Sequence, residues 1–327
     1  MSPSSSAFEH RPVLLSEVVE ALAARAGTSD EAALFVDATY GRGGHARALL
    51  ARLGPLDRLV VLDRDPAAVD HAHEWARSEP RVLVLKGRFG SIRSLMEAAG
   101  LGPVDALLVD LGVSSAQLDD PSRGFSFRFS GPLDMRMDNN SGETLATWLD
   151  HVDQADLSQI LTELGDLPAS SAKRISQAIA ATRRTAPITT TDELAALVRP
   201  LVGRPKRRSQ LKRDPATGVF QALRMHMNQE VDELRAVLDQ GFELLRERGR
   251  MAVISFHSIE DRIVKLKFRH LLMGDPGLAK LPIRGCQSQA LSVLRRAVPR
   301  VEEVNANPRA RSAKLRVIEK RTMEMAA

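Results

Sequence analysis

The chain has 327 residues and a formal net charge of +5; 43% of its residues are hydrophobic and 27% are charged. No run approaches the roughly 18 apolar residues of a membrane span, and the polar start has no signal-peptide pattern, so a cytoplasmic location without membrane contact is expected. The single cysteine, Cys286, excludes an internal disulfide and any zinc site built from several cysteines.

The first third of the chain alternates short apolar runs with helical patterns. Apolar runs without polar alternation are typical of strands that are covered on both faces, and hence of a parallel sheet. Strands are expected at 34–38, 59–62, 82–85 and 106–109. Helices are expected at 16–25, 45–53, 67–77 and 91–99. This series of strand and helix units predicts an α/β fold.

The alternation stops after Asp110. The following residues, 114–141, are polar and rich in turn formers, and 143–202 have helical periodicity throughout, which predicts a helical insert. An amphipathic helix at 228–246 and strand patterns at 251–256 and 315–318 then complete the sheet. We therefore expect a discontinuous α/β domain at 10–115 and 216–327, a helical substrate-recognition domain at 116–215, and a disordered terminus at 1–9.

A glycine-rich turn joins the first strand to the helix that follows it. The sequence YGRGGHA occupies residues 40–46, and Gly41, Gly43 and the alanine fit the dinucleotide pattern G-x-G-x-x-A. A glycine turn at a helix N-terminus holds nucleotide-like ligands. On this motif alone, NAD, FAD and S-adenosylmethionine remain equal alternatives.

Acidic residues end the first, second and fourth predicted strands, and ligands of open parallel sheets gather at that edge. Asp63 is placed to bind ribose hydroxyls of either NAD or S-adenosylmethionine. Asp37 would repel a pyrophosphate but can pair with the ammonium group of a methionine moiety. Phe89 is placed to cover an adenine, and Asp110 to receive a reacting amine. Together these positions favour S-adenosylmethionine, and nothing in the sequence indicates a metal site.

Two further polar clusters, at 134–138 and 255–261, are candidate site segments, although a capping network would explain either one equally well. Asp134 and His257 are the catalytic candidates in them, with His257 orienting a base or phosphate. Ser258 is expected to cap the next helix, with Asp261 three residues further on. Arg136 is a candidate RNA contact.

A basic segment at 199–213 contains no acidic residue. It is either a solvated surface or an electrostatic footprint for phosphates, such as those of a nucleic acid. Its candidate RNA-binding residues are Arg204, Lys206, Arg207, Arg208, Lys212 and Arg213. Three phenylalanines, Phe125, Phe127 and Phe129, either stack on bases or anchor their loop in the core.

Eight motifs resemble those of the MraW/RsmH family of bacterial 16S rRNA cytosine methyltransferases. They are HRPVLL at 10–15, DATYGRGGH at 37–45, DRDP at 63–66, DLGVSSAQLDD at 110–120, RGFSF at 123–127, GPLDMRMD at 131–138, ISFHSIEDR at 254–262 and NPRARS at 307–312. The resemblance implies a class I, Rossmann-like methyltransferase domain with a helical insert. It also implies S-adenosylmethionine as donor and the N4 amine of a decoding-centre cytosine as target. The cofactor positions that it implies are Gly43, Gly44, His45, Asp63, Phe89, Asp110 and Gln117.

Two stretches depart from the family pattern. The sequence LPASS at 167–171 stands where relatives usually carry a second acidic residue. Asp214 stands where the family generally has His, and Gly218 where it has Arg. Any RNA contact that relatives make through these residues is therefore expected to be lost or rerouted.

The expected chemistry needs no metal. Asp110 and the main-chain carbonyls of 111–113 are expected to accept the hydrogens of the amine, so that positioning supplies most of the catalysis. The expected partner is small-subunit rRNA or the assembled subunit, and the sequence leaves open whether the chain forms a homodimer. Two alternatives remain, a nicotinamide-dependent oxidoreductase and an RNA-binding or assembly factor that keeps the fold without turnover.

Overall fold

The structure, a computed structural model, describes residues 12–23, 32–202, 214–273 and 290–321. It divides the chain into an α/β unit, residues 1–112 and 232–327, and a helical unit, residues 113–231. Cys286, the expected disordered terminus and the six basic candidates between 204 and 213 lie outside the described residues. Among the helices that are described, none combines the length and the apolar character needed to cross a membrane.

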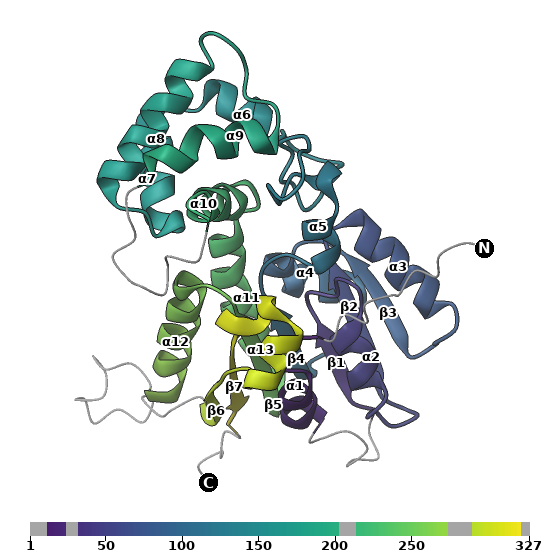
Figure 1. The fold of residues 1–327 in the computed structure, drawn as a ribbon. Helices are drawn as coiled ribbons and strands as arrows, with labels where there is room; N and C mark the ends of the chain where they lie inside the picture. Colours follow the sequence, from purple (N-terminus) through teal and green to yellow (C-terminus); the bar gives the residue numbers. More distant parts are fainter. Residues whose placement is uncertain (1–11, 24–31, 203–213, 274–289, 322–327) are drawn as a thin grey trace. The chain divides into compact units, whose positions relative to one another are not determined.

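A seven-stranded sheet with the order β3-β2-β1-β4-β5-β7-β6 forms the centre of the α/β unit. Its five parallel strands are β1 (Leu34–Asp37), β2 (Arg58–Asp63), β3 (Val82–Lys86), β4 (Val104–Asp110) and β5 (Leu245–Ser255). Two strands, β7 (Lys314–Lys320) and β6 (Ala290–Ala297), extend it in antiparallel fashion. The expected mostly parallel, Rossmann-like sheet is confirmed (Figure 1).

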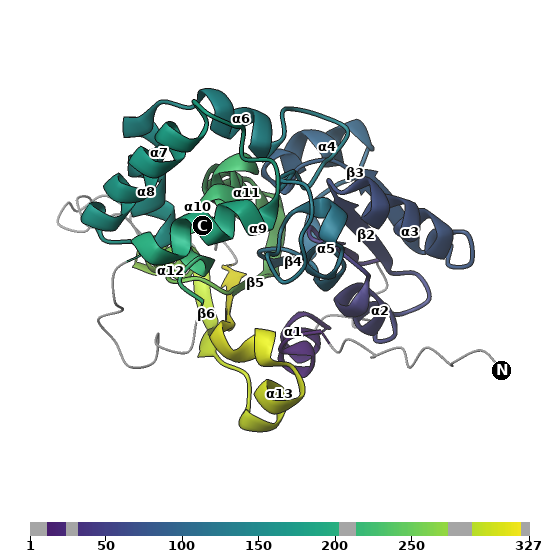
Figure 2. The same cartoon turned by 45° about the horizontal axis from the view of Figure 1, so that its top comes forward.

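Helices cover both faces of this sheet, which explains the continuous apolar strands. Neighbouring residues of one strand enter different cores: Phe35 packs in the core with α1 and α2, and Val36 packs in the core with α4 and α11. The helices of the unit, seen from a second direction in Figure 2, are α1 (Leu15–Leu22), α2 (Gly44–Leu50), α3 (Pro66–Ala76), α4 (Ile92–Ala98), α11 (Glu230–Leu244), α12 (Ser258–Met273) and α13 (Val301–Ala306).

The expected strand at 251–256 is longer than predicted. β5 begins at Leu245, which is buried and pairs with Val104, so the strand replaces the last turn of the helix expected to reach 246. Strand β6 and helix α13 were not predicted, whereas α12 is the helix that was expected to follow Ser258. β6 is an edge strand with Leu291 and Val293 exposed, so it lacks the apolar run of a covered strand.

The helical unit has its own apolar core. Its helices are α5 (Ser115–Asp119), α6 (Leu145–His151), α7 (Gln154–Gly165), α8 (Ala169–Thr182), α9 (Thr191–Val198) and α10 (Thr217–Met227). The insert was expected to end at 215, but its division from the α/β unit falls after 231. The reason is that Phe220 and Leu223 of α10 are buried in the core of the helical unit.

The two stretches that depart from the family pattern meet in this unit. A Cβ atom on Gly218 would lie 2.8 Å from the carbonyl oxygen of Gly165 and 3.3 Å from Leu167 Cδ2. Helices α7 and α10 therefore approach closely enough that only glycine fits, and Leu167 covers the contact. Asp214, the other departure, binds Arg199 (Nε to Oδ2, 3.0 Å) and accepts from the backbone N–H of Ala216 at 2.8 Å.

Candidate functional site

The glycine turn connects the end of β1 to α2, as predicted. Gly41 and Gly43 have φ values of 56° and 75°, in the left-handed region that favours glycine. Gly44 is the first residue of α2. The Gly41 N–H donates to Asp63 Oδ2 at 2.8 Å, and Asp63 Oδ1 accepts from the Asp65 N–H at 2.9 Å. The carboxylate that ends β2 therefore fixes the turn, and burial raises its pKa.

Asp37 and Asp110 end the adjacent strands β1 and β4 and are joined through one threonine. Thr39 N–H donates to Asp37 Oδ1 at 3.1 Å, while Thr39 Oγ1 accepts from the Asp110 N–H at 2.7 Å. Asp37 is 1% exposed, and burial raises its pKa to about 7. The sequence analysis missed Thr39; the signal available was a hydroxyl residue two positions after a strand-end aspartate.

His45 lies between the backbone of Val13 and the side chain of Asp110. Its Nε2 is 2.9 Å from the Val13 carbonyl oxygen, which can only accept, so Nε2 carries the hydrogen and Nδ1 is left towards Asp110 Oδ2 at 3.4 Å. Burial lowers the pKa of His45 to about 4, so the ring is neutral near pH 7. Burial, with the charges of Asp37 and Glu260, raises the pKa of Asp110 well above its usual range.

This edge of the sheet holds buried carboxyl groups for which the described residues provide no matching lysine or arginine. In the described part of the chain, neither Asp37 nor Asp110 forms an ion pair with a lysine or arginine, and Asp110 Oδ1 is buried without a hydrogen-bond partner. An unpaired buried carboxylate is unfavourable unless a ligand completes it. The residues therefore fit a positively charged ligand together with a group that donates a hydrogen bond. S-adenosylmethionine would provide the positive charge, and the amine that receives the methyl group would donate the hydrogen bond.

Phe89 follows β3, as predicted, and begins the short helix Phe89–Ser91. Its half-buried ring packs against the apolar core. The next residue, Gly90, donates its N–H to Glu233 Oε2 at 2.8 Å, which fixes this turn to α11. The ring is thus held in place beyond a strand end, although the adenine contact predicted for it stays a prediction.

His257 lies at the carboxyl end of β5, whose Ile254 pairs with Asp110. The expected capping pair of Ser258 and Asp261 is wrong. Glu260 Oε2 instead accepts from the N–H groups of Phe256 and His257, at 2.8 and 3.0 Å, and Asp261 binds Lys314 and Arg316. The spacing of a capping box, counted from His257 to Glu260, was the signal that could have found this arrangement.

Three of the predicted site residues that the structure describes lie in the helical unit, and each has a structural role there. Asp134 and Arg136 form a two-bond ion pair, with N–O distances of 2.8 and 2.7 Å. Gln117 is 7% exposed and closes a capping box with Ser114. The catalytic role of Asp134, the RNA contact of Arg136 and the cofactor contact of Gln117 stay predictions.

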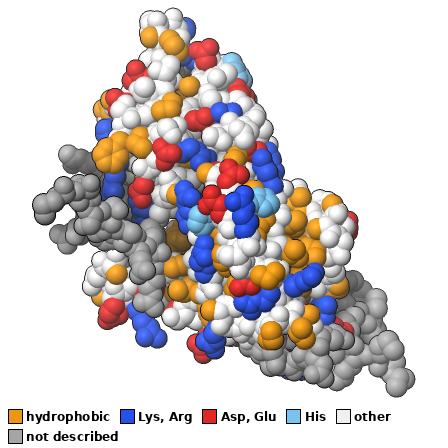
Figure 3. All heavy atoms as spheres, turned by 90° about the vertical axis from the view of Figure 1, so that its right-hand side faces the viewer, with side chains coloured by type: hydrophobic (Ala, Val, Ile, Leu, Met, Phe, Trp, Pro, Cys, Tyr) orange, Lys and Arg blue, Asp and Glu red, His pale blue; other side chains and the backbone are white. Residues whose placement is uncertain are grey.

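Of the three phenylalanines that were expected either to stack on bases or to anchor their loop, two anchor the loop and the third is exposed. Phe125 is buried, and Phe127 packs edge-on against Phe220 with ring centroids 4.7 Å apart, so both anchor the loop. Phe129 is 63% exposed. The face drawn in Figure 3 intermixes basic and acidic side chains.

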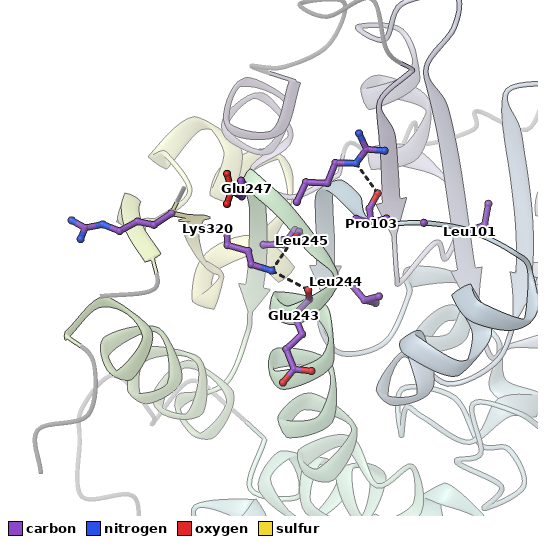
Figure 4. Close-up of a pocket in the computed structure, with 10 residues that line it drawn as sticks. Leu101, Pro103, Glu243, Leu244, Leu245, Glu247 and Lys320 are labelled. Carbon is purple, nitrogen blue, oxygen red and sulfur yellow. Dashed lines mark hydrogen bonds between the residues drawn. The ribbon is translucent and has the colours of Figure 1, made fainter. Parts of the chain in front are cut away.

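A pocket at the other end of the sheet, drawn in Figure 4, contains none of the predicted site residues. Lys320 lies in it and donates to the carbonyl oxygens of Glu243 and Leu245, at 3.0 and 2.7 Å. This amine therefore caps the carboxyl end of α11. Within the described residues, no group of three or more His, Cys, Asp or Glu side chains could hold a metal ion.

Comparison with known proteins matches residues 7–321 to the MraW methylase family. The chain is 45% identical over 320 residues to ribosomal RNA small subunit methyltransferase H of Chromobacterium violaceum, covering 97% of each chain. It is 46% identical over 314 residues to the protein of the same name from Thiobacillus denitrificans, covering 95% of this chain and 97% of the relative. Among solved structures, an rRNA methylase from Streptococcus thermophilus aligns with a TM-score of 0.36 and 11% identity over 94% of each chain.

Proposed function

The chain belongs to the MraW methylase family, and from this premise we propose that it methylates the N4 amine of a cytosine in small-subunit 16S rRNA, with S-adenosylmethionine as donor. The name shared by the full-length relatives supports rRNA of the small subunit as the substrate class. The cytosine amine follows from the motif resemblance. Membership of a methylase family rules out the alternative of a nicotinamide-dependent oxidoreductase.

The observation that carries this proposal is the unpaired acidic edge of the sheet. Among the described residues, Asp37 is buried without a cation, and Asp110 keeps one buried oxygen without a partner. When bound, S-adenosylmethionine supplies an electrophilic methyl group on a positively charged sulfur. Asp37 would hold the ammonium group of the donor, Asp63 its ribose, and Phe89 its adenine.

Asp110 is the proposed catalytic residue. The cytosine amine is a weak nucleophile because its lone pair is delocalised into the ring, so acceptors that hold its hydrogens favour the tetrahedral geometry needed for attack. Within the described ranges, Asp110 Oδ1 has no hydrogen-bond partner. Thr39 fixes the backbone of Asp110, and His45 faces its second oxygen. His257 is proposed to orient the base or phosphate from the neighbouring strand.

The RNA would be held electrostatically by the basic segment at 199–213 and by Arg136. Lys and Arg contacts to phosphates release counterions, so binding of RNA should weaken steeply as salt is raised. Because a cytosine amine is accessible only in an unpaired or extruded nucleotide, the substrate must present its target outside a duplex.

The test mixes the protein with methyl-labelled S-adenosylmethionine and either small ribosomal subunits or free 16S rRNA, and locates the label by mass spectrometry. We expect label on N4 of one cytosine. Binding of the donor without transfer to either substrate would instead favour a non-catalytic assembly factor. Calorimetric binding of NAD in place of S-adenosylmethionine would overturn the donor assignment.

A further inference from the structure

A contact between the side chains of Tyr40 and His71, outside the predicted site, supports the glycine turn. Tyr40 is the only tyrosine of the chain and is 3% exposed. Its hydroxyl lies 2.8 Å from Nδ1 of His71, a half-buried residue of α3 that is 31 positions further along the chain. Trp75, one turn later in α3, stacks on the Tyr40 ring at 6.1 Å with an interplanar angle of 17°. Helix α3 therefore holds this ring with two side chains.

The Tyr40 ring in turn sets the position of the turn. A Cβ atom on Gly43 would lie 2.6 Å from Tyr40 Cε2, so the backbone of Gly43 rests directly on the ring. The Tyr40 carbonyl accepts from the Gly43 N–H at 2.8 Å, and the Tyr40 N–H donates to Leu62 O at 3.0 Å. Between these anchors, the Gly41 N–H binds the Asp63 carboxylate. Movement of the ring would therefore move the N–H group that orients Asp63.

The protonation states suit this contact at neutral pH. Burial raises the pKa of Tyr40 to about 12, so the hydroxyl keeps its hydrogen. Burial and the charges of Arg42 and Arg47 lower the pKa of His71, so its ring stays neutral and one nitrogen remains an acceptor. Arg47 also lies 4.5 Å above the Trp75 ring, which closes the cluster from α2.

We infer that His71 is a positioning residue for the cofactor, acting through the Tyr40 hydroxyl to hold the glycine turn and Asp63 in their binding geometry. The inference rests on the proposed function for the identity of the ligand. His71 is absent from every motif of the resemblance and touches none of the predicted catalytic residues. Its effect should consequently fall on cofactor binding and leave the chemical step unchanged.

The experiment measures S-adenosylmethionine affinity by calorimetry, and turnover at saturating cofactor. We expect His71→Ala to weaken affinity about threefold to tenfold, with turnover within about twofold of wild type. His71→Asn should restore affinity, because its side-chain amide places a polar atom near the position of Nδ1. In a Tyr40→Phe background, His71→Ala should have no further effect. His73→Ala, at an exposed position of the same helix, is the matched control.

Because the chain has one tyrosine, tyrosine labelled with carbon-13 at Cζ, the carbon that carries the hydroxyl, gives a single NMR signal that reports on the hydroxyl without cofactor. That signal should move in His71→Ala and return in His71→Asn. Unchanged affinity in His71→Ala, or an equal loss in His71→Asn, would overturn the inference. Failure of the wild-type protein to bind S-adenosylmethionine would overturn the proposed function, and this inference with it.

Discussion

Two sites, one in each unit, treat buried charge in opposite ways. In the helical unit, Arg224 and Glu230 are both at least nine-tenths buried and meet in a two-bond ion pair at 2.8 and 2.9 Å. In the α/β unit, Asp37 and Asp110 are held at strand ends without an ion pair to lysine or arginine among the described residues. In a buried pair each charge compensates the other, whereas a buried charge without a partner costs stability and is kept for a ligand. Charge alone therefore does not identify a site.

The same difference explains why the motif at 134–138 was an ambiguous candidate. Asp134 satisfies Arg136, and Asn228 binds the backbone of the same loop, donating to Met135 O and accepting from Met137 N–H, both at 2.8 Å. Asp138, the third polar residue of the motif, accepts from the Asn140 N–H and the Ser141 hydroxyl, so every polar residue of the motif has a partner within the helical unit. A sequence shows that a carboxylate and a guanidinium are near in the chain, but not whether each is the other's partner.

Breaking the buried pair of the helical unit should give the largest effect on stability. We expect Glu230→Gln to lower the free energy of unfolding by about 3–5 kcal/mol, because the Arg224 guanidinium would remain buried without its counter-charge. Denaturant unfolding measures this loss. Arg235→Gln removes a charge from an exposed pair on α11 and should change stability by less than about 1 kcal/mol. An equally small loss in Glu230→Gln would contradict the structural role of paired charge.

Removing the unpaired charge of β4 should affect turnover and spare the fold. We expect Asp110→Asn to lower methyl transfer by about 100-fold to 1,000-fold, because the acceptor for the amine hydrogens is weakened. Asp105→Asn, in the same strand, is the control: Asp105 is buried and bonds the Leu34 N–H at 2.9 Å, so it should lower stability but not turnover of the folded protein. Turnover near wild type with cofactor affinity intact would remove Asp110 from the chemistry.

The acidic strand ends could be predicted from the sequence, while the residues that position them could not. Asp37, Asp63 and Asp110 follow apolar runs, and parallel strands bring such ends to one edge regardless of loop detail. Thr39 and His71 act through contacts with residues 71 and 31 positions away, at Asp110 and Tyr40. Such contacts depend on how helices pack on the sheet, which periodicity does not encode.

The pH dependence of cofactor binding tests whether the unpaired carboxylate of Asp37 binds the positively charged cofactor. Its pKa of about 7 means that below this pH a proton must leave before a cation binds, so the affinity should fall about tenfold per pH unit below 7 and level off above it. Calorimetry between pH 5.5 and 8.5 measures this. The amine of the ligand titrates in the same range, and Asp37→Asn, which should bind weakly, provides the correction for it.

The same variant should be more stable than the wild type, which is the reverse of Glu230→Gln. Because folding raises the pKa of Asp37 from 3.8 to about 7, the wild type loses stability as pH rises from 4 to 7. Asp37→Asn lacks this loss, so we expect a gain on the order of 1–4 kcal/mol at pH 8 that vanishes below pH 4. A less stable Asp37→Asn at pH 8 would show that this carboxylate serves the fold.

The variant with the smallest expected effect tests whether the helical unit can lose stability without a loss of cofactor affinity in the α/β unit. We expect Gly218→Ala to lower stability by about 1–3 kcal/mol, because the new Cβ atom would lie 2.8 Å from the Gly165 carbonyl oxygen and force α7 and α10 apart. Gly102→Ala, where the added Cβ meets nothing within 4 Å, is the matched control and should be neutral. Cofactor affinity should stay at the wild-type value in both variants, since Asp37, Asp63 and Asp110 belong to the α/β unit and Gln117, a cofactor candidate in the helical unit, lies in α5 and not in α7 or α10. A loss of affinity in Gly218→Ala alone would show that packing of the helical unit also sets the cofactor site.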